Sequence, residues 1–212
     1  MRRRGAGRSL AQQEFLTVAG RVLHSSDYQR MPWKNGGGTT TEIWKAVSPD
    51  GEMLWRLSIA DVASDGPFSL FPGIDRVIMV IEGKGMELAV GGQGVRRLSD
   101  LFEPFAFYGD AKTDCRLIAG PIRDFNLMVA RSYGSGALRI QHLAPTDTAP
   151  FAENVAALHV LRGRIELESG AVHALSAGDT WIAGTYGGAT GRALAPTILA
   201  AIVIDPNQRA AL

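Results

Sequence analysis

A short glycine-rich segment carries the most concentrated set of groups that could contact a ligand. It reads Trp33-Lys34-Asn35-Gly36-Gly37-Gly38. Successive glycines let the backbone approach a ligand closely and can present several N–H groups to an anion. Trp33 adds an aromatic wall, and Lys34 and Asn35 add polar donors. The lysine precedes the glycines and no helix pattern follows, so the segment matches neither the P-loop nor the glycine fingerprint of dinucleotide-binding proteins. The segment is either a binding loop, which we favour, or a flexible connection.

Cationic and polar side chains further along the chain could hold a carboxylate. Arg56 and Ser58 share one face of an alternating strand, because successive strand residues point to opposite sides. The planar guanidinium of Arg76 suits a carboxylate bound through two hydrogen bonds. Alternatively, Arg76 pairs with Asp75 or Asp110 and only balances a buried charge. Four further side chains could orient such cations or bind an amide, namely Glu42, Asp110, Asp124 and Asn126.

Histidine and cysteine are too sparse to indicate a metal centre or an activated nucleophile. The histidines are His24, His142, His159 and His173. His159 and His173 lack a clear carboxylate partner and make a poor transition-metal set, so we interpret them as structural or surface residues. Cys115 has no sequence cue for activation. We therefore predict no metal, no other cofactor and no assigned catalytic residue, although an acid–base reaction using Glu42 or Asp110 with Lys34 remains an alternative.

Composition and charge exclude several classes of protein. The chain has 212 residues, of which 46% are hydrophobic and 20% charged, as in folded globular proteins. Its net charge of +1 argues against a nucleic-acid-binding face. Its single cysteine excludes an intramolecular disulfide, and the basic start lacks the apolar stretch of a secretory signal. We expect a cytoplasmic protein that binds neither nucleic acid nor membrane, and we leave a homodimer open.

Short apolar runs separated by glycine and proline predict many strands and few helices. In residues 54–60, Trp55, Leu57 and Ile59 alternate with polar residues, and residues 77–81 form a continuous β-branched run. The best helix candidate is a weak one over residues 10–18. One pattern then occurs twice, as Val80-Ile81-Glu82-Gly83 and as Val160-Leu161-Arg162-Gly163 with a later Leu175-Ser176-Ala177-Gly178-Asp179. We interpret each glycine as a hairpin residue with positive φ.

This repeat resembles the cupin superfamily, in which such a glycine motif and a later Gly-Asp mark one small barrel. The resemblance implies an all-β fold with two cupin-type β-barrels, a bicupin, whereas the alternative is two unrelated hairpins in one sandwich. We expect a partly disordered tail at 1–20, an N-terminal barrel at 21–140 and a C-terminal barrel at 141–212 that shares strands with the first half. The join is expected between Arg139 and Phe151. Cupin metal sites are typically rich in His, and here Arg76 stands near their usual place.

A second resemblance is more specific and spans residues 31–128. The motif Met31-Pro32-Trp33-Lys34-Asn35-Gly36-Gly37-Gly38-Thr39-Thr40-Thr41-Glu42-Ile43 is similar to the signature of the HutD/Ves family. Blocks at 55–58, 73–76, 107–110 and 120–128 agree with it in order and spacing. The resemblance implies bicupins linked to histidine utilisation or to stress, with a ligand-binding or regulatory role and formylglutamate as one candidate ligand. It implies no settled catalytic activity.

We therefore expect a metal-independent protein that binds a small anionic metabolite without converting it. The alternative is a metal-independent isomerase or lyase acting on a small carboxylate in the same pocket. A pocket carboxylate that is not paired with Arg or Lys would favour the enzyme, and fully paired acids would favour binding. The expected ligand-binding residues are Trp33, Lys34, Asn35, Gly36, Gly37, Glu42, Arg56, Ser58, Arg76, Asp110, Asp124 and Asn126.

Overall fold

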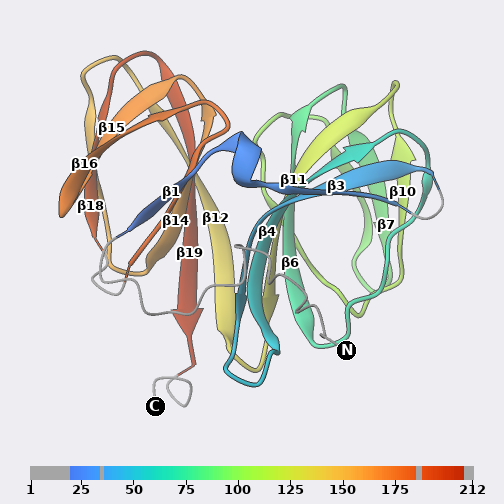
Figure 1. Cartoon of the computed structure of the whole chain (residues 1–212). Helices are drawn as coiled ribbons and strands as arrows, with labels where there is room; N and C mark the ends of the chain where they lie inside the picture. Colours follow the sequence, from blue (N-terminus) through green and yellow to red (C-terminus); the bar gives the residue numbers. More distant parts are fainter. Residues whose placement is uncertain (1–19, 34–35, 185–187, 208–212) are drawn as a thin grey trace, which may run out of the picture.

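The computed structural model describes residues 20–33, 36–184 and 188–207. Within these ranges the chain is all β apart from a single 3-10 turn, η1 (Ser25–Asp27), and it forms two units that lie side by side (Figure 1). The described part of the chain holds no helix long and apolar enough to cross a membrane. The helix candidate at 10–18 and nearly all of the expected tail lie outside the described residues, as do Lys34 and Asn35.

The first unit is built from two antiparallel sheets that enclose an apolar core. The larger sheet has the order β2-β3-β4-β11-β6-β9 and the smaller has the order β5-β10-β7-β8. Their bounds are β2 (Gln29–Pro32), β3 (Gly38–Val47), β4 (Met53–Val62), β5 (Gly66–Pro67), β6 (Ile74–Glu82), β7 (Met86–Val90), β8 (Gly94–Leu98), β9 (Phe105–Tyr108), β10 (Thr113–Leu117) and β11 (Ile122–Ala130). Both sheets contribute to the core, as Ile78 and Val80 on β6 and Met86 and Leu88 on β7 show.

The second unit repeats this plan with sheets of order β1-β17-β14-β19-β12 and β13-β18-β15-β16. Their bounds are β1 (Arg21–Leu23), β12 (Gly134–Leu143), β13 (Thr148–Phe151), β14 (Val155–Arg162), β15 (Arg164–Ser169), β16 (Ala171–Ser176), β17 (Thr180–Ile182), β18 (Ala189–Ala193) and β19 (Thr197–Pro206). Its core includes the fully buried Trp181 with Val160 and Leu167. Two units of this kind agree with the expected all-β fold.

The two larger sheets pack against each other and form a third core between the units. Phe125 and Leu127 of β11 meet Ala157 of β14 and Ile202 of β19 there. The alternation expected in residues 54–60 serves this contact, because Trp55, Leu57 and Ile59 point into the shared core. The opposite face of β4 carries Arg56 and Ser58, which consequently point into the interior of the first unit.

The repeated glycines mark corners where the chain passes from one sheet to the other. Gly83 has φ +99° and Gly163 has φ +84°, so the expected positive φ is confirmed. The hairpin interpretation is wrong, because β6 and β7 belong to different sheets, as do β14 and β15. Each corner is tight. A Cβ atom on Gly83 would lie 2.7 Å from the Pro121 carbonyl oxygen, and one on Gly163 would lie 2.3 Å from that of Pro196.

The division between the units differs from the expected one at both ends. Position 140/141 falls inside β12, which pairs with β19 from Gly134 to Leu143, so the sheets separate at the turn between β11 and β12. At the other end, β1 pairs with β17 of the second unit before the chain crosses to β2 of the first unit. Tyr28 holds this crossing, since its hydroxyl donates to the Gly178 carbonyl oxygen at 2.6 Å.

Candidate ligand-binding site

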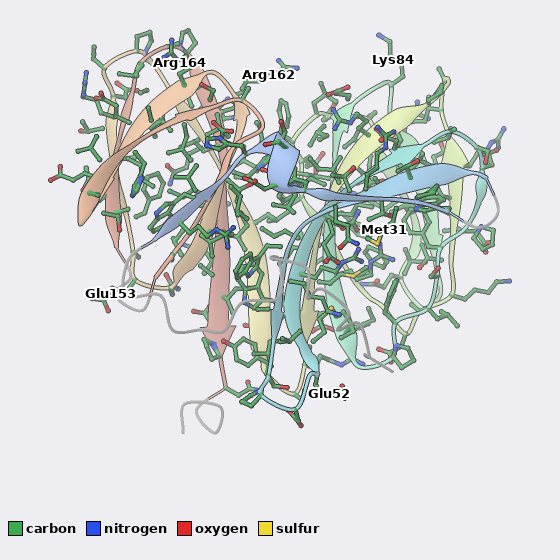
Figure 2. The ribbon with its side chains drawn as sticks, in the orientation of Figure 1. Met31, Glu52, Lys84, Glu153, Arg162 and Arg164 are labelled. Carbon is green, nitrogen blue, oxygen red and sulfur yellow. The ribbon has the colours of Figure 1, made fainter. Side chains whose placement is uncertain are left out.

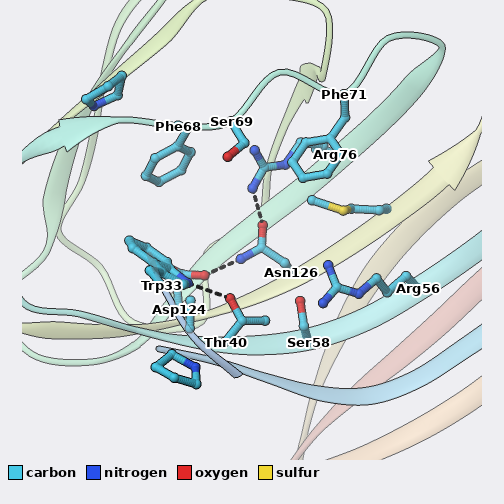
Figure 3. A pocket seen from close by; sticks show the side chains of 14 residues that line it. Trp33, Thr40, Arg56, Ser58, Phe68, Ser69, Phe71, Arg76, Asp124 and Asn126 are labelled. Carbon is cyan, nitrogen blue, oxygen red and sulfur yellow. Dashed lines mark hydrogen bonds between the residues drawn. The ribbon is translucent and has the colours of Figure 1, made fainter. Parts of the chain in front are cut away.

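A cavity of about 470 Å³ opens at one end of the first unit's interior (Figure 3). Three central strands of the larger sheet form its floor, and the segment between β5 and β6 and the end of β2 form its walls. The lining residues are Pro32, Trp33, Thr40, Arg56, Ser58, Ala60, Pro67, Phe68, Ser69, Phe71, Arg76, Asp124, Asn126 and Met128.

Strand register arranges the polar floor residues in rows across the sheet. On β11, Met128 lies opposite Arg56 of β4 on one side and opposite Arg76 of β6 on the other. The next inward-facing residue of β11 is Asn126, opposite Ser58, and the next is Asp124, opposite Ala60. Four residues along a strand correspond to roughly 13 Å between Cα atoms. The floor therefore runs from a row with two arginines, past an amide, to a carboxylate.

Arg76 is held in the cavity floor by aromatic rings and by one amide. Its side chain is only 6% exposed, and its Cζ atom lies 5.2 Å from the ring centroid of Phe68, 5.5 Å from that of Phe71 and 4.8 Å from that of Phe107. Its Nη2 donates to Asn126 Oδ1 at 2.8 Å, while its buried Nε has no partner. Burial lowers the pKa of Arg76 to about 10, against the opposing effect of Asp124, so the side chain stays cationic at neutral pH.

Asp124 is a buried carboxyl group without a cationic partner in direct contact. It is 1% exposed and accepts a hydrogen bond from Asn126 Nδ2, and among the described residues no Arg or Lys forms an ion pair with it. Burial raises the pKa of Asp124 to about 7, although Arg76 and the Asn126 hydrogen bond act in the opposite direction. The carboxyl group can therefore exchange a proton near neutral pH.

Arg56 is partly neutralised by an acidic residue that does not itself line the cavity. Its Nε donates to Glu42 Oε2 at 2.6 Å, and both side chains are largely buried. The terminal nitrogens of Arg56 make no hydrogen bond within the described chain, nor does the hydroxyl group of the buried Ser58. Donors on these two residues therefore remain for a molecule in the cavity, towards which both point (Figure 3).

Trp33 closes one wall of the cavity. Its indole Nε1 donates to Thr40 Oγ1 at 2.8 Å, which fixes the ring at the start of β3 (Figure 3). The third glycine of the triplet makes this position accessible, because a Cβ atom on Gly38 would lie 2.4 Å from the Asp61 carbonyl oxygen and 3.0 Å from the indole ring. Gly38 thus leaves room for the packing of Trp33.

The cavity brings together half of the residues that the sequence nominated. These are Trp33, Arg56, Ser58, Arg76, Asp124 and Asn126. Glu42 forms an ion pair with Arg56 but does not line the cavity, and neither do Gly36 and Gly37. Asp110 belongs elsewhere, because it accepts hydrogen bonds from Arg131 and from the Gly73 backbone N–H. Lys34 and Asn35 lie outside the described residues.

The alternative for Arg76, a charge pair with Asp75 or Asp110, is wrong. Both carboxylates bind Arg131 on the surface instead. The sequence did not indicate the residues of the cavity walls. Phe68, Ser69 and Phe71 come from a segment without a strand pattern. Thr40 could have been predicted, because it lies two residues before Glu42 on the same strand face.

The histidines lie apart from this cavity. His159 is buried in the second unit, where its Nδ1 lies 2.8 Å from Thr180 Oγ1 and its ring lies 5.0 Å from that of Phe125. Burial lowers the pKa of His159 to about 4, so it is neutral and occupied in packing. Throughout the described ranges, no three His, Cys, Asp or Glu side chains come together as a set that could hold a metal.

Comparison with solved structures defines the class of protein. An oxalate decarboxylase from Lactobacillus farciminis, solved as a formate complex, superimposes with a TM-score of 0.68 over 93% of this chain and 89% of that chain, at 7% identity. A likeness at this identity concerns the fold alone, and the fold is the all-β fold of cupin proteins.

Sequence comparison then places the chain in a family. The HutD family model matches residues 25–196, and the chain belongs to the HutD family. A conserved protein of unknown function from Pseudomonas aeruginosa PAO1 has a TM-score of 0.79 and 33% identity, covering 88% of this chain and 98% of that chain. HutD from Pseudomonas fluorescens SBW25, solved in a formate condition, has a TM-score of 0.70 and 35% identity over 88% and 100%. The HutD/Ves resemblance is thereby confirmed.

Two curated relatives match over part of their length. A 21.2 kDa protein of Pseudomonas putida, described as uncharacterized and encoded in the hutC 3′ region, is 50% identical over 113 residues, which are 51% of this chain and 57% of the relative. Protein Ves of Citrobacter koseri is 36% identical over 118 residues, which are 54% of this chain and 61% of the relative. The chain thus matches little more than half of each curated relative.

Proposed function

We propose that this protein binds a small carboxylate in the cavity of its first unit without converting it, and that occupancy of the cavity regulates histidine utilisation or a stress response in the cytoplasm. Arg76 is the principal contact for the carboxylate, and Arg56 and Ser58 are additional donors. Trp33 and Phe68 cover the apolar part of the ligand.

The observation that carries this proposal is the set of unused donors around one cavity. Arg76 Nε is buried without a partner, and the terminal nitrogens of Arg56 make no hydrogen bond within the described chain. Buried donors without partners are costly, and each is typically satisfied by a protein group, water or a ligand. A carboxylate is the group that best matches the guanidinium fork.

Support for the pathway comes from the relatives. The Pseudomonas putida protein is encoded beside hutC, and the family carries the name HutD. A regulatory role fits a cavity lined by two arginines and by hydroxyl and amide groups that can receive an anion.

A second function is favoured by one observation. Asp124 is a cavity carboxyl group without a direct Arg or Lys partner among the described residues, which is the feature expected of an enzyme's base. On this alternative the cavity belongs to a metal-independent isomerase or lyase, in which Asp124 removes a proton from the bound acid and returns it.

Calorimetry with glutamate, formylglutamate and urocanate at pH 6.5 tests the proposal, with proton NMR of each mixture after incubation. Binding of one acid without chemical change supports it, and conversion of that acid supports the enzyme. Arg76→Ala should weaken binding by about 1.5–3 kcal/mol, typical of a lost charged hydrogen bond. Arg164→Ala is the matched control, because Arg164 is exposed in the second unit (Figure 2). Full affinity in Arg76→Ala would show that the site is wrong.

A further inference from the structure

The charges around the cavity nearly cancel, which is unexpected for a site that binds an anion. Arg56 and Arg76 contribute two positive charges, and Glu42 and an ionised Asp124 contribute two negative charges, giving zero. Lys34 lies outside the described residues and is not counted in this net charge. If Asp124 is protonated, the same four groups carry one positive charge, which matches a monoanion.

Asn126 fixes the relation between the cationic row and Asp124. Its Oδ1 accepts from Arg76 and its Nδ2 donates to Asp124 Oδ1 (Figure 3). A single amide therefore spans the distance between the guanidinium and the carboxyl group. The other oxygen of Asp124 has no hydrogen-bond partner within the described chain. A ligand of about five carbon atoms, lying along this amide, reaches from the Arg76 guanidinium to the Asp124 carboxyl group.

We infer that the cavity takes up a carboxylate monoanion together with a proton held by Asp124, and that the protonated Asp124 donates a hydrogen bond to an acceptor at the far end of the ligand. Asp124 is thus a specificity-determining residue that selects a keto or amide oxygen over an ammonium group. This inference rests on the proposed function and specifies the chemistry of its ligand.

The surroundings of Asp124 favour this protonated form. Arg76 of β6 is the cation that faces it, and the half-buried Asp61 of β4 adds a repulsive charge. Cys115 of β10 is neutral, because burial raises the pKa of its thiol to about 12. A bound carboxylate at Arg76 brings a further negative charge and offsets the attraction of Asp124 to that arginine, so ionised Asp124 becomes less favourable in the complex.

Matched probes separate the alternatives. The acids 5-oxohexanoate, hexanoate and 5-aminopentanoate share a carboxylate and differ at the far end, and none titrates between pH 6 and 8.5 near the expected transition. We expect 5-oxohexanoate to bind best. Its affinity should be nearly constant below pH 7 and should fall about tenfold per pH unit above it, because a proton must then be taken up.

Calorimetry in buffers of different ionisation enthalpy should show uptake of about one proton per ligand at pH 8 in the unaltered protein. Asp124→Asn should bind 5-oxohexanoate without this pH dependence and at least tenfold more tightly than the parent at pH 8.5, while Asp61→Asn should keep the parent's slope. Binding without proton uptake, or preference for 5-aminopentanoate with affinity rising with pH, would overturn the inference and leave the proposed site standing. If neither these acids nor formylglutamate, glutamate and urocanate bind at any pH, the proposed function fails and the inference with it.

Discussion

Arg76 on β6 donates a hydrogen bond of 2.8 Å from Nη2 to Asn126 Oδ1 on β11, and the same amide donates to Asp124. Within the described chain, Asn126 is therefore the side chain that hydrogen-bonds both of these buried ionisable groups, and its loss leaves both without that partner. We expect Asn126→Ala to lower the free energy of unfolding by about 2–4 kcal/mol, since each buried polar group left without a partner costs about 1–3 kcal/mol.

Urea denaturation at pH 7 measures this difference. Ser58→Ala is the control, because Ser58 lies opposite Asn126 on β4 and is equally buried, but its hydroxyl makes no hydrogen bond within the described chain. It should cost less than about 1 kcal/mol. Equal stability of the two variants would show that the Arg76–Asn126–Asp124 chain contributes nothing to folding.

Trp33 should report ligand binding by fluorescence. It lines the cavity, whereas Trp44, Trp55 and Trp181 do not. Titration with a binding acid should change the intrinsic emission, because a ligand replaces water beside the indole ring. The change should disappear in Trp33→Phe and persist in Trp44→Phe. An unchanged signal in Trp33→Phe would place the ligand away from this wall.

The strand pattern predicted the polar floor better than the walls. Period-two alternation on β4 predicted that Arg56 and Ser58 share a face, and the apolar positions between them became the shared core; β11 follows the same alternation, with Asp124 and Asn126 on the cavity side. Such a pattern is local in the sequence. The ion pair of Asp110 depends instead on the arrangement of the strands, because Arg131 lies 21 residues away and reaches Asp110 only once β9 and β11 flank β6.

The aromatic wall shows a second limit of the sequence. Phe68 and Phe71 come from an irregular segment between β5 and β6, so no periodicity relates them to the arginine that they enclose. The sequence repeat predicts the positions of the corner glycines but not their geometry, since positive φ alone does not distinguish a hairpin from a passage between sheets.

Removing the charge of Asp124 should stabilise the protein at alkaline pH. Burial raises the pKa of Asp124 to about 7 from its ordinary value of 3.8, so the folded state holds the proton more tightly than the unfolded state. The stability that depends on this proton is present below pH 3.8 and is lost as pH rises towards 7. Asp124→Asn should therefore gain stability relative to the parent between pH 4 and 8, reaching about 1–4 kcal/mol.

Thermal or urea denaturation of both proteins at several pH values gives this difference. His159 acts oppositely, because burial lowers its pKa from 6.5 to about 4 and its contribution is lost as pH falls between these values. The His159 effect is the same in the parent and in the variant, so it cancels when their free energies of unfolding are subtracted. A difference that does not change between pH 4 and 8 would mean that Asp124 titrates normally.

The purified protein should retain no stoichiometric transition metal. No three potential metal ligands among His, Cys, Asp and Glu gather in the part of the chain that the structure describes, and buried His159 is bonded to Thr180. Elemental analysis after dialysis against a chelator measures the content. Roughly one metal ion per chain, retained after this treatment, would contradict the prediction and would require ligands from outside the described residues.

The two corner glycines should be equivalent in their intolerance of a side chain. Gly83→Ala and Gly163→Ala each force a Cβ atom against a backbone carbonyl oxygen, at 2.7 Å and 2.3 Å, in addition to placing alanine at positive φ. We expect each to lower the free energy of unfolding by about 2–4 kcal/mol, since strained backbone and overpacking each cost about 1–3 kcal/mol.

Gly51→Ala separates the two contributions. Gly51 has φ +92° in the turn between β3 and β4, but a Cβ atom there would meet nothing within 4 Å. Its replacement therefore carries the backbone strain alone, about 1–2 kcal/mol. Urea denaturation should rank both corner variants below Gly51→Ala. If Gly163→Ala were no less stable than Gly51→Ala, the corner between β14 and β15 would not be the tight passage between sheets that repeats the one between β6 and β7.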